Sequence, residues 1–277
     1  MVKLIYMLFL LYYLPSGSIL ADGIIKEQTL PTSQGKTLFV KAFCGDVNVT
    51  TWNKDEANIK IYGNDNAKEY LNFDIEEKNG NIHVTVTNKD GVTSTSGVNL
   101  KIEASIPEKY NAEVSSAGGD LKLSSIKGNL ELKTAGGNII LNEITGTSEL
   151  KTAGGDIKVS SYSGVLKAKT AGGNIDFNGS DCSISAKTAG GNITVKYSGE
   201  NKGIELSSTG GDIKLFVPEN FSSNIILSTN GGDIKSEIDI KGKYNSSKSK
   251  INGTINNGGE EVSCKSNGGN ITIEKLK

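Results

Sequence analysis

Residues 154–171 read GGDIKVSSYSGVLKAKTA. This stretch contains two runs of alternating apolar residues, at positions 157–159 and 166–168, with a Ser/Gly corner between them. Alternation at period two is typical of half-buried strands. Two strands and two turns take up the whole stretch, so no helix of useful length fits between them. The stretch therefore predicts one coil of a β-structure.

The opening tetrapeptide, Gly-Gly-Asp/Asn-Ile, recurs along the C-terminal two thirds of the chain. The first four steps between copies are equal in length, the next two are slightly longer, and the last is much longer with a partial copy at Gly258-Gly259. Helical and leucine-rich repeats have other spacings. We therefore expect an all-β fold, a single-stranded β-solenoid (β-helix) with coils of about 18–21 residues stacked ~4.8 Å apart. The copies begin at Gly118, Gly136, Gly154, Gly172, Gly190, Gly210, Gly231 and Gly268.

Alignment of the coils on this tetrapeptide places similar residues above one another in columns. Inward columns of Leu, Ile, Val, Phe and Ala start at Leu121, Leu123 and Leu132. One coil buries too little surface on its own, so the core forms only when neighbouring coils stack. We expect the paired glycines to adopt positive φ and to leave no Cβ against the next coil. The Asp or Asn that follows them is expected to bond its own turn backbone.

Residues 22–117 contain strands without the strict repeat. Within them Cys44-Gly45-Asp46-Val47 resembles a degenerate copy of the same turn. We interpret this part as an irregular N-terminal β region, made of the first coils and hairpins of the same solenoid. Residues 22–277 then form one continuous domain, with regular coils and a C-terminal cap over residues 118–277. A separate β-sandwich is the alternative. The strands expected before the repeats cover residues 37–49, 58–62, 70–76, 81–87 and 98–106.

Residues 1–21 have the layout of a secretory signal peptide. Lys3 precedes an apolar run over residues 4–14, and a breaker with small residues follows. The run is short for a membrane span, which takes roughly 20 apolar residues. We expect cleavage after Ala21 or Ser18 and export to the periplasm, the outer cell surface or the medium. An uncleaved N-terminal membrane anchor is the alternative.

The charge of the chain argues against a nucleic-acid-binding protein. The formal net charge is -1, the pI is near 6.0, and all 30 basic residues are Lys. A dedicated nucleic-acid binder normally carries a basic excess. A chain without Arg also has no guanidinium fork for two-point binding of phosphate or carboxylate.

The three cysteines, Cys44, Cys182 and Cys264, are far apart in the sequence and odd in number. In an exported protein this does not indicate a disulfide framework. Cys264 follows Val262 at strand spacing, which favours a buried free thiol. One disulfide with a leftover thiol remains open.

Catalytic side chains are scarce. His83 is the only histidine, and the alternation of residues 82–86 places it on the side of the strand opposite Ile82, Val84 and Val86. A solvent-facing strand residue is the favoured interpretation. One His and three scattered Cys do not make a structural zinc site. Polysaccharide-cleaving β-helices need clustered carboxylates or basic groups, which are spread out here. We expect no enzyme, no catalytic residue, no cofactor and no metal.

Two further columns raise specific hypotheses. Stacked Asp and Asn after the glycines would suggest Ca²⁺, as in calcium-binding β-helix repeats. The motif lacks the later Gly and Asp of those repeats, and Asp212 and Asp233 are the one pair of acids in adjacent copies. A turn-forming role is therefore favoured. The Thr column could resemble an ice-binding array, but alternation points it inward, which favours a buried hydroxyl ladder. Its members are Thr134, Thr152, Thr170 and Thr188.

A basic stripe is the candidate binding feature. Four lysines recur at the same place in successive coils and face outward, and Lys167 adds to them. Glu131 and Glu149 partly offset their charge. The stripe is a candidate site for an anionic envelope glycan or phospholipid, and a solvated face that discourages sheet stacking is the alternative. The stripe consists of Lys133, Lys151, Lys167, Lys169 and Lys187.

The chain also resembles a known family, the bacterial "putative adhesin" domain-of-unknown-function family of β-strand-repeat proteins. The resemblance spans residues 36–277. It rests on residues 44–49 with Trp52, on the Gly-Gly-Asp/Asn-Ile coils, and on the closing segments 255–259 and 267–273. It implies an exported or membrane-anchored β-solenoid of the cell envelope, and it carries over no catalytic residue.

These observations predict an envelope interaction module that contacts a surface protein or glycan and is peripheral to the membrane at most. The alternative function is an accessory protein of an envelope stress-response or signalling system that binds a membrane partner. Exposed sheet edges at the ends of a solenoid can pair between molecules unless they are capped. Residues 274–277 are charged and have the character of a cap, so we expect a monomer or a weak dimer.

Overall fold

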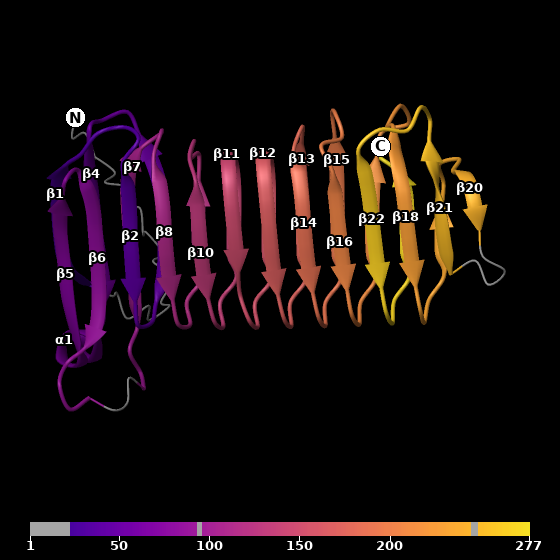
Figure 1. The fold of residues 1–277 in the computed structure, drawn as a ribbon. Coiled ribbons are helices and arrows are strands. Elements are labelled where there is room, and N and C mark those ends of the chain that lie inside the picture. The colour runs from indigo at the N-terminus through magenta and orange to yellow at the C-terminus, as the bar shows by residue number, and fades with distance from the viewer. Residues whose placement is uncertain (1–22, 93–95, 245–248) are drawn as a thin grey trace, which may run out of the picture.

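The chain folds as an elongated rack of β-coils in a computed structural model, which describes residues 23–92, 96–244 and 249–277 (Figure 1). The expected leader, residues 1–21, lies outside the described residues. The described elements, in chain order, are β1 (Gly23–Pro31), β2 (Thr37–Ala42), β3 (Asp46–Trp52), β4 (Glu56–Gly63), α1 (Asp65–Tyr70), β5 (Leu71–Lys78), β6 (Asn81–Asn88), β7 (Leu100–Pro107), β8 (Asn111–Ser116), β9 (Leu121–Ser124), β10 (Leu130–Thr134), β11 (Ile139–Lys151), β12 (Ile157–Thr170), β13 (Ile175–Ser180), β14 (Ser183–Thr188), β15 (Ile193–Ser198), β16 (Ile204–Ser208), β17 (Ile213–Val217), β18 (Ser223–Thr229), β19 (Ile234–Ser236), β20 (Lys241–Tyr244), β21 (Lys250–Ile255), β22 (Glu261–Ser266) and β23 (Ile271–Lys275).

Each coil contributes one strand to each of two faces, so the predicted all-β solenoid is confirmed. We call the sheet of β2, β8, β10, β14, β16, β22 and β18 the front face. We call the sheet of β7, β3, β9, β13, β15, β17, β23 and β19 the back face. Strands β11 and β12 bend from the back face to the front face and belong to both. Within the described part of the chain, no helix has the length and apolarity needed to span a membrane.

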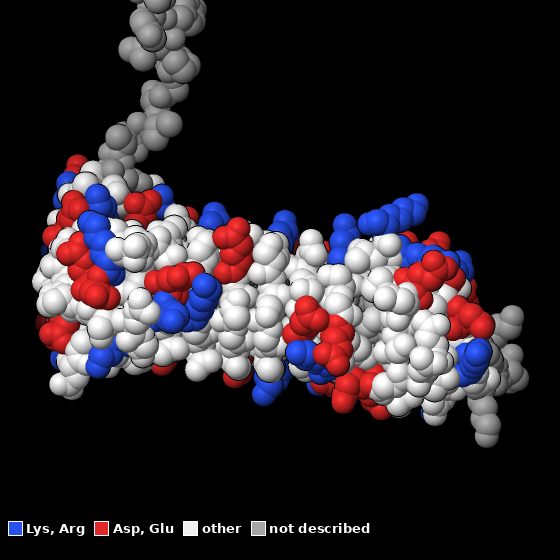
Figure 2. Space-filling view, turned by 90° about the horizontal axis from the view of Figure 1, so that it is seen from above, with Lys and Arg blue, Asp and Glu red and all other residues white. Residues whose placement is uncertain are grey.

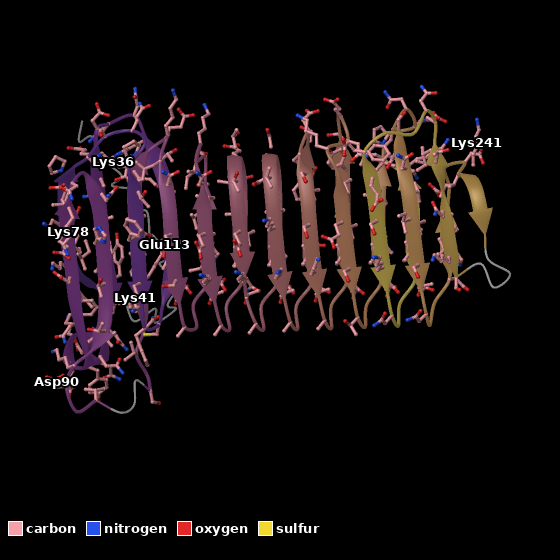
Figure 3. All side chains as sticks on the ribbon, viewed as in Figure 1. Lys36, Lys41, Lys78, Asp90, Glu113 and Lys241 are labelled. Atoms are coloured by element: carbon pink, nitrogen blue, oxygen red, sulfur yellow. The ribbon has the colours of Figure 1, made fainter. Side chains whose placement is uncertain are left out.

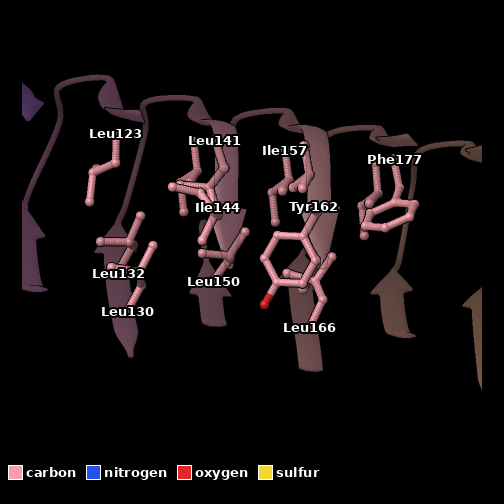
Figure 4. Packing of buried hydrophobic residues seen from close by; sticks show 14 of the residues in the cluster. Leu123, Leu130, Leu132, Leu141, Ile144, Leu150, Ile157, Tyr162, Leu166 and Phe177 are labelled. Atoms are coloured by element: carbon pink, nitrogen blue, oxygen red, sulfur yellow. The ribbon is translucent and has the colours of Figure 1, made fainter. Parts of the chain in front are cut away.

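The core lies between the two faces and is built from the predicted columns. Ile139, Ile157 and Ile175 are directly opposite one another on adjacent back-face strands, and each is fully buried. Larger side chains such as Tyr162 and Phe177 fill the space near the upper corner, where their rings meet edge to face (Figure 4). Since the regular coils pair in register, apart from a shift between Ser160 and Tyr162, similar apolar residues stack on one another and the core continues along the rack.

The coils do not stack in chain order at the C-terminal end. Strands β22 and β23 lie between the coil of β16 and β17 and the coil of β18 and β19. The long last step in the repeat is therefore an excursion through β20 and β21, after which the last coil enters between two coils formed earlier in the sequence. Residues 274–277, expected to cap the stack, instead form the end of the interior strand β23 and the two residues after it.

The N-terminal end has a similar arrangement. The coil of β2 and β3 lies between the coil of β6 and β7 and the coil of β8 and β9. The degenerate turn at Cys44–Val47 therefore stacks directly on the first regular repeat. Antiparallel strands close both ends: β5 and β4 with β1 at one end, β21 and β20 at the other.

The glycine pairs have one of the two roles expected of them: the second glycine leaves no Cβ against the next coil, but neither glycine adopts positive φ. None of the paired glycines in the eight regular repeats has positive φ. The second glycine of each pair is needed for space, because a Cβ at Gly155 would lie 2.0 Å from the carbonyl oxygen of Gly137. A Cβ at Gly154 would meet no atom closer than 3.9 Å. Positive φ occurs instead at the opposite corner, at Ser125, Glu143, Ser161 and Asp181.

The threonine column completes this turn, and the predicted buried hydroxyl ladder is confirmed. The Thr170 hydroxyl donates to the carbonyl oxygen of Gly155 in the preceding coil at 2.9 Å and accepts from the Gly173 N–H at 3.2 Å. Thr134, Thr152 and Thr188 make the same pair of bonds. Ser takes the position in three other coils, at Ser116, Ser208 and Ser266. One hydroxyl thus serves two buried backbone groups in each turn.

The Asp/Asn column bonds the neighbouring coil, so the prediction that it bonds its own turn is wrong. The Oδ1 atom of Asp156 accepts from the backbone N–H of Asn174 at 2.8 Å, and Asn138 accepts from the N–H of Asp156 at 2.9 Å. The ladder continues through Asp212, Asn270 and Asp233. Each side chain therefore ties its coil to the next.

Replacement of the Thr170 hydroxyl tests the ladder. We expect Thr170→Val to lower the free energy of unfolding by about 1–3 kcal/mol, because it leaves the Gly155 carbonyl and the Gly173 N–H buried without this partner. Thr170→Ser keeps the hydroxyl and should lose less, as the serines at equivalent positions indicate. Urea unfolding of the three proteins measures the difference. Equal stability of the Val and Ser variants would contradict the ladder.

Candidate functional site

The predicted lysine stripe forms a continuous row across the front face. Lys133 is directly opposite Lys151, Lys151 opposite Lys169, and Lys169 opposite Lys187, on four adjacent strand segments. Lys167 lies in a second row, beside Glu149. The parallel in-register stacking of the coils brings these side chains together although they are far apart in the sequence. They point outward, since the residues between them are buried.

The row extends beyond the lysines that were predicted from the sequence. At the N-terminal side, Ser115 lies between Lys133 and Lys41 on adjacent strands. At the C-terminal side, Ser207 lies between Lys187 and Lys265. Lys265 has the same offset from Gly268 that Lys133 has from Gly136. That signal could have found Lys265. Figure 3 labels Lys41, which is in this row, and Glu113, which is in the second row with Glu131, Glu149 and Lys167.

Three lysines of the stripe have carboxylate partners. Lys133 pairs with Glu131 and Lys151 with Glu149 along their own strands. Lys187 pairs across strands with Glu205 at 2.7 Å. The hydrogen bond that Lys133 donates to Glu131 raises the pKa of Lys133, and the hydrogen bonds donated by Lys151 and Lys187 lower the pKa of Glu149 and Glu205. These pairs are solvent-exposed, so they hold charges in place more than they stabilise the fold.

Lys167 and Lys169, in the middle of the stripe, have no ion-pair partner among the described residues. Both are exposed and both are on β12. The positive charge of the stripe is therefore greatest at its centre and is partly neutralised on either side. An anionic group would meet less competition from protein carboxylates at Lys169, which has lysines opposite it on both sides, than at Lys167, which lies opposite Glu149.

His83 lies on the outer side of β6, as expected. Its ring stacks on Phe39 of β2, with centroids 4.6 Å apart and planes 12° from parallel. Residues on either side of it, Ile82 and Val84, are buried. The described residues contain no group of three or more His, Cys, Asp or Glu side chains that could hold a metal ion. Asp212 and Asp233, proposed as adjacent acids from the sequence, are not adjacent, because Asn270 lies between them.

The three cysteines are free thiols. Cys182 and Cys264 are fully buried, and burial raises the pKa of each to about 12. Cys44 is half-buried, and burial raises its pKa as well. The open alternative of one disulfide with a leftover thiol is therefore wrong for this structure, and the buried free thiol at Cys264 is confirmed. Thiols held neutral in this way are not activated nucleophiles.

Stacked coils that present rows of outward side chains define a repeat protein of the β-solenoid class. The family model described as Toastrack DUF4097 matches residues 36–274, and the chain belongs to that family. The resemblance drawn from residues 44–49 and the closing Gly-Gly segments is thereby confirmed. No curated protein matches the chain.

Several solved structures are similar to the chain at low identity. A putative adhesin from Bacteroides fragilis is 15% identical, with 92% of this chain and 97% of that chain covered and a TM-score of 0.40. A putative lipid binding protein from Parabacteroides distasonis is 16% identical, with 93% and 98% covered and a TM-score of 0.43. A putative adhesin from Parabacteroides merdae is 14% identical, with 91% and 96% covered and a TM-score of 0.28.

Thiol labelling tests the burial of the cysteines. We expect a native-state reaction with iodoacetamide at a mildly alkaline pH to modify Cys44 alone, because the other two thiols are buried and their pKa values are about 12. Denaturation should expose all three. Mass spectrometry counts the labels, and Cys44→Ser is the control that should remain unlabelled in the native state. Fast native labelling of Cys264 would contradict the packing of β22.

Proposed function

We propose that the protein is an exported, non-catalytic interaction scaffold of the cell envelope, and that its front face is the contact surface. The leader-like residues 1–21 and membership of the Toastrack DUF4097 family support this proposal. The fold supports it as well, because a stack of in-register coils holds its outward side chains in fixed rows. An adhesin-like role requires such a surface and requires no catalytic group.

The observation that carries the proposal is the in-register row Lys133, Lys151, Lys169 and Lys187. Adjacent strands in a sheet are ~4.8 Å apart, so the row presents an ammonium group at each of four successive steps. An extended anionic polymer laid across the strands would meet a lysine at each coil. We therefore propose an acidic glycan of the envelope or cell surface as the partner. The lysines are point charges without the guanidinium fork of Arg, which suits a flexible polymer with spaced carboxylates or sulfates.

The cellular location has a direct test. Fractionation of the native organism, combined with labelling of intact cells by a membrane-impermeant reagent, should find the protein in the envelope or outside the cell. Loss of the leader, residues 1–21, from the mature chain would accompany export and would be seen by mass spectrometry. Recovery of the full-length chain in the cytoplasm alone would contradict the proposal.

The charge row predicts the binding behaviour of lysine variants. Lys167→Gln combined with Lys169→Gln should weaken binding to polygalacturonate roughly thirtyfold, since each lysine near an anionic surface contributes about 1 kcal/mol. Added salt should weaken the unmodified protein further, because the exposed charges are screened. Isothermal titration calorimetry at low and high salt measures both effects.

The matched control is Lys158→Gln combined with Lys214→Gln, two exposed lysines on the back face. This variant has the same net charge as the front-face variant. If the two variants lose the same affinity, net charge and not the front-face row governs binding, and the proposal is wrong.

A further inference from the structure

A concave surface lies apart from the lysine row, at the corner where the back-face strands end. This corner is the upper edge in Figure 1. The pocket encloses about 370 Å³ over the end of β7. Three segments meet there: the β1–β2 connection with Gln34, the β3–β4 connection with Asn53 and Asp55, and Pro107 at the end of β7. Strand β4 pairs with the far side of β7, so the β3–β4 connection must cross the end of β7 and wall the pocket.

Trp52 forms one wall and is held in place by its neighbours. Its indole Nε1 donates to the carbonyl oxygen of Glu56 at 2.8 Å, and the backbone of Trp52 is opposite Pro107 on the adjacent strand. The ammonium of Lys54 lies 4.4 Å from the ring centroid and also pairs with Glu56 at 3.2 Å. Trp52 is half-buried, so part of an aromatic surface is fixed at the wall of a polar pocket. Fixed aromatic surfaces of this kind bind apolar parts of a ligand without losing much side-chain freedom.

The polar side chains of the pocket are free to bind a ligand. Gln34, Asn53 and Asp55 make no side-chain hydrogen bond within the part of the chain that the structure describes. By contrast, Glu108 at the rim is paired with Lys127 at 2.7 Å. The pocket thus offers two amides and one carboxylate as convergent donors and acceptors.

The charges of the lining side chains argue against an anionic ligand. Its one lysine, Lys54, is engaged by Glu56 and the Trp52 ring, and Asp55 is the carboxylate without an ion-pair partner among the described residues. The edge seen from above carries Lys and acidic side chains interspersed, with no patch of a single sign around the described N-terminal part (Figure 2). A metal ion is not favoured either, since no group of three potential ligands is found among the residues that the structure describes.

We propose that this pocket binds a sugar residue of a neutral oligosaccharide. A sugar has C–H faces that pack on an indole ring and hydroxyl groups that bond amides and carboxylates, which is the combination found here. The volume is at the small end of the range for ligand pockets, about 300–1,000 Å³, which fits one or two sugar units. This inference does not rest on the front-face proposal, because the two surfaces share no residue.

Trp52 reports on this site directly, because it is the only tryptophan in the chain. Neutral trisaccharides of glucose, mannose and N-acetylglucosamine should be titrated into the mature protein while Trp emission is recorded. At least one of them should shift or quench the emission with a dissociation constant of roughly 1 mM or tighter. The same protein should show no such change with the acidic polymer used for the front face.

Two substitutions separate binding from folding. Asn53→Ala and Asp55→Ala remove exposed side chains that hold no internal hydrogen bond in the described structure, so the fold should be retained, and each should weaken the binding of that trisaccharide about tenfold. Asp176→Ala, an equally exposed acid on the back face, is the matched control and should leave binding unchanged. If no neutral trisaccharide changes Trp52 emission, or if the Asn53 and Asp55 variants bind as the unmodified protein does, the pocket is not a sugar site.

Discussion

The fold depends on the contact between the second glycines of successive turns. In each regular coil the position of a Cβ on this glycine would be 1.9–2.3 Å from the carbonyl oxygen of the corresponding glycine in the adjacent coil. No other residue can occupy the position without moving the backbone. In the turn at Gly173 the close approach would leave the Gly155 carbonyl and the Gly173 N–H without partners. The hydroxyl of Thr170 bonds both groups, and a Thr or Ser hydroxyl does the same in the other turns. Glycine and hydroxyl therefore act as one unit that sets how the coils are stacked.

The surface follows from this stacking. Once the turns are superimposed, both strands of every coil are in register, and any residue at a fixed offset from the glycines becomes part of a row. The lysine row exists for this reason, as do the Asp/Asn ladder and the buried Ile column. Rows on a stiff sheet suit a partner that is itself extended and repetitive. The Trp52 pocket has a different origin, because it occurs where the regular stacking ends and connections cross the end of β7.

The sequence predicted what depends on the repeat. The period of the Gly-Gly tetrapeptide implied the solenoid, the alternation around Thr170 implied its inward direction, and the offset of the lysines implied their row. The order of the coils at the ends was not predictable, because the same Gly-Gly turn recurs in every coil and does not specify which coils are its neighbours. In the structure the turn at Gly268 lies between the turns at Gly210 and Gly231. The Trp52 pocket was missed because Gln34, Asn53 and Pro107 are brought together by non-repeating connections.

The role of the second glycine is tested most directly by two alanine variants in the same turn. Gly155→Ala places a Cβ 2.0 Å from the Gly137 carbonyl oxygen, and Gly154→Ala places one in ordinary space at 3.9 Å. Neither glycine has positive φ, so backbone strain does not distinguish them. Urea unfolding should show a loss of about 3 kcal/mol or more for Gly155→Ala and a change within about 1 kcal/mol for Gly154→Ala. Equal stability of the two variants would contradict the claim that contact at the second glycine governs the stack.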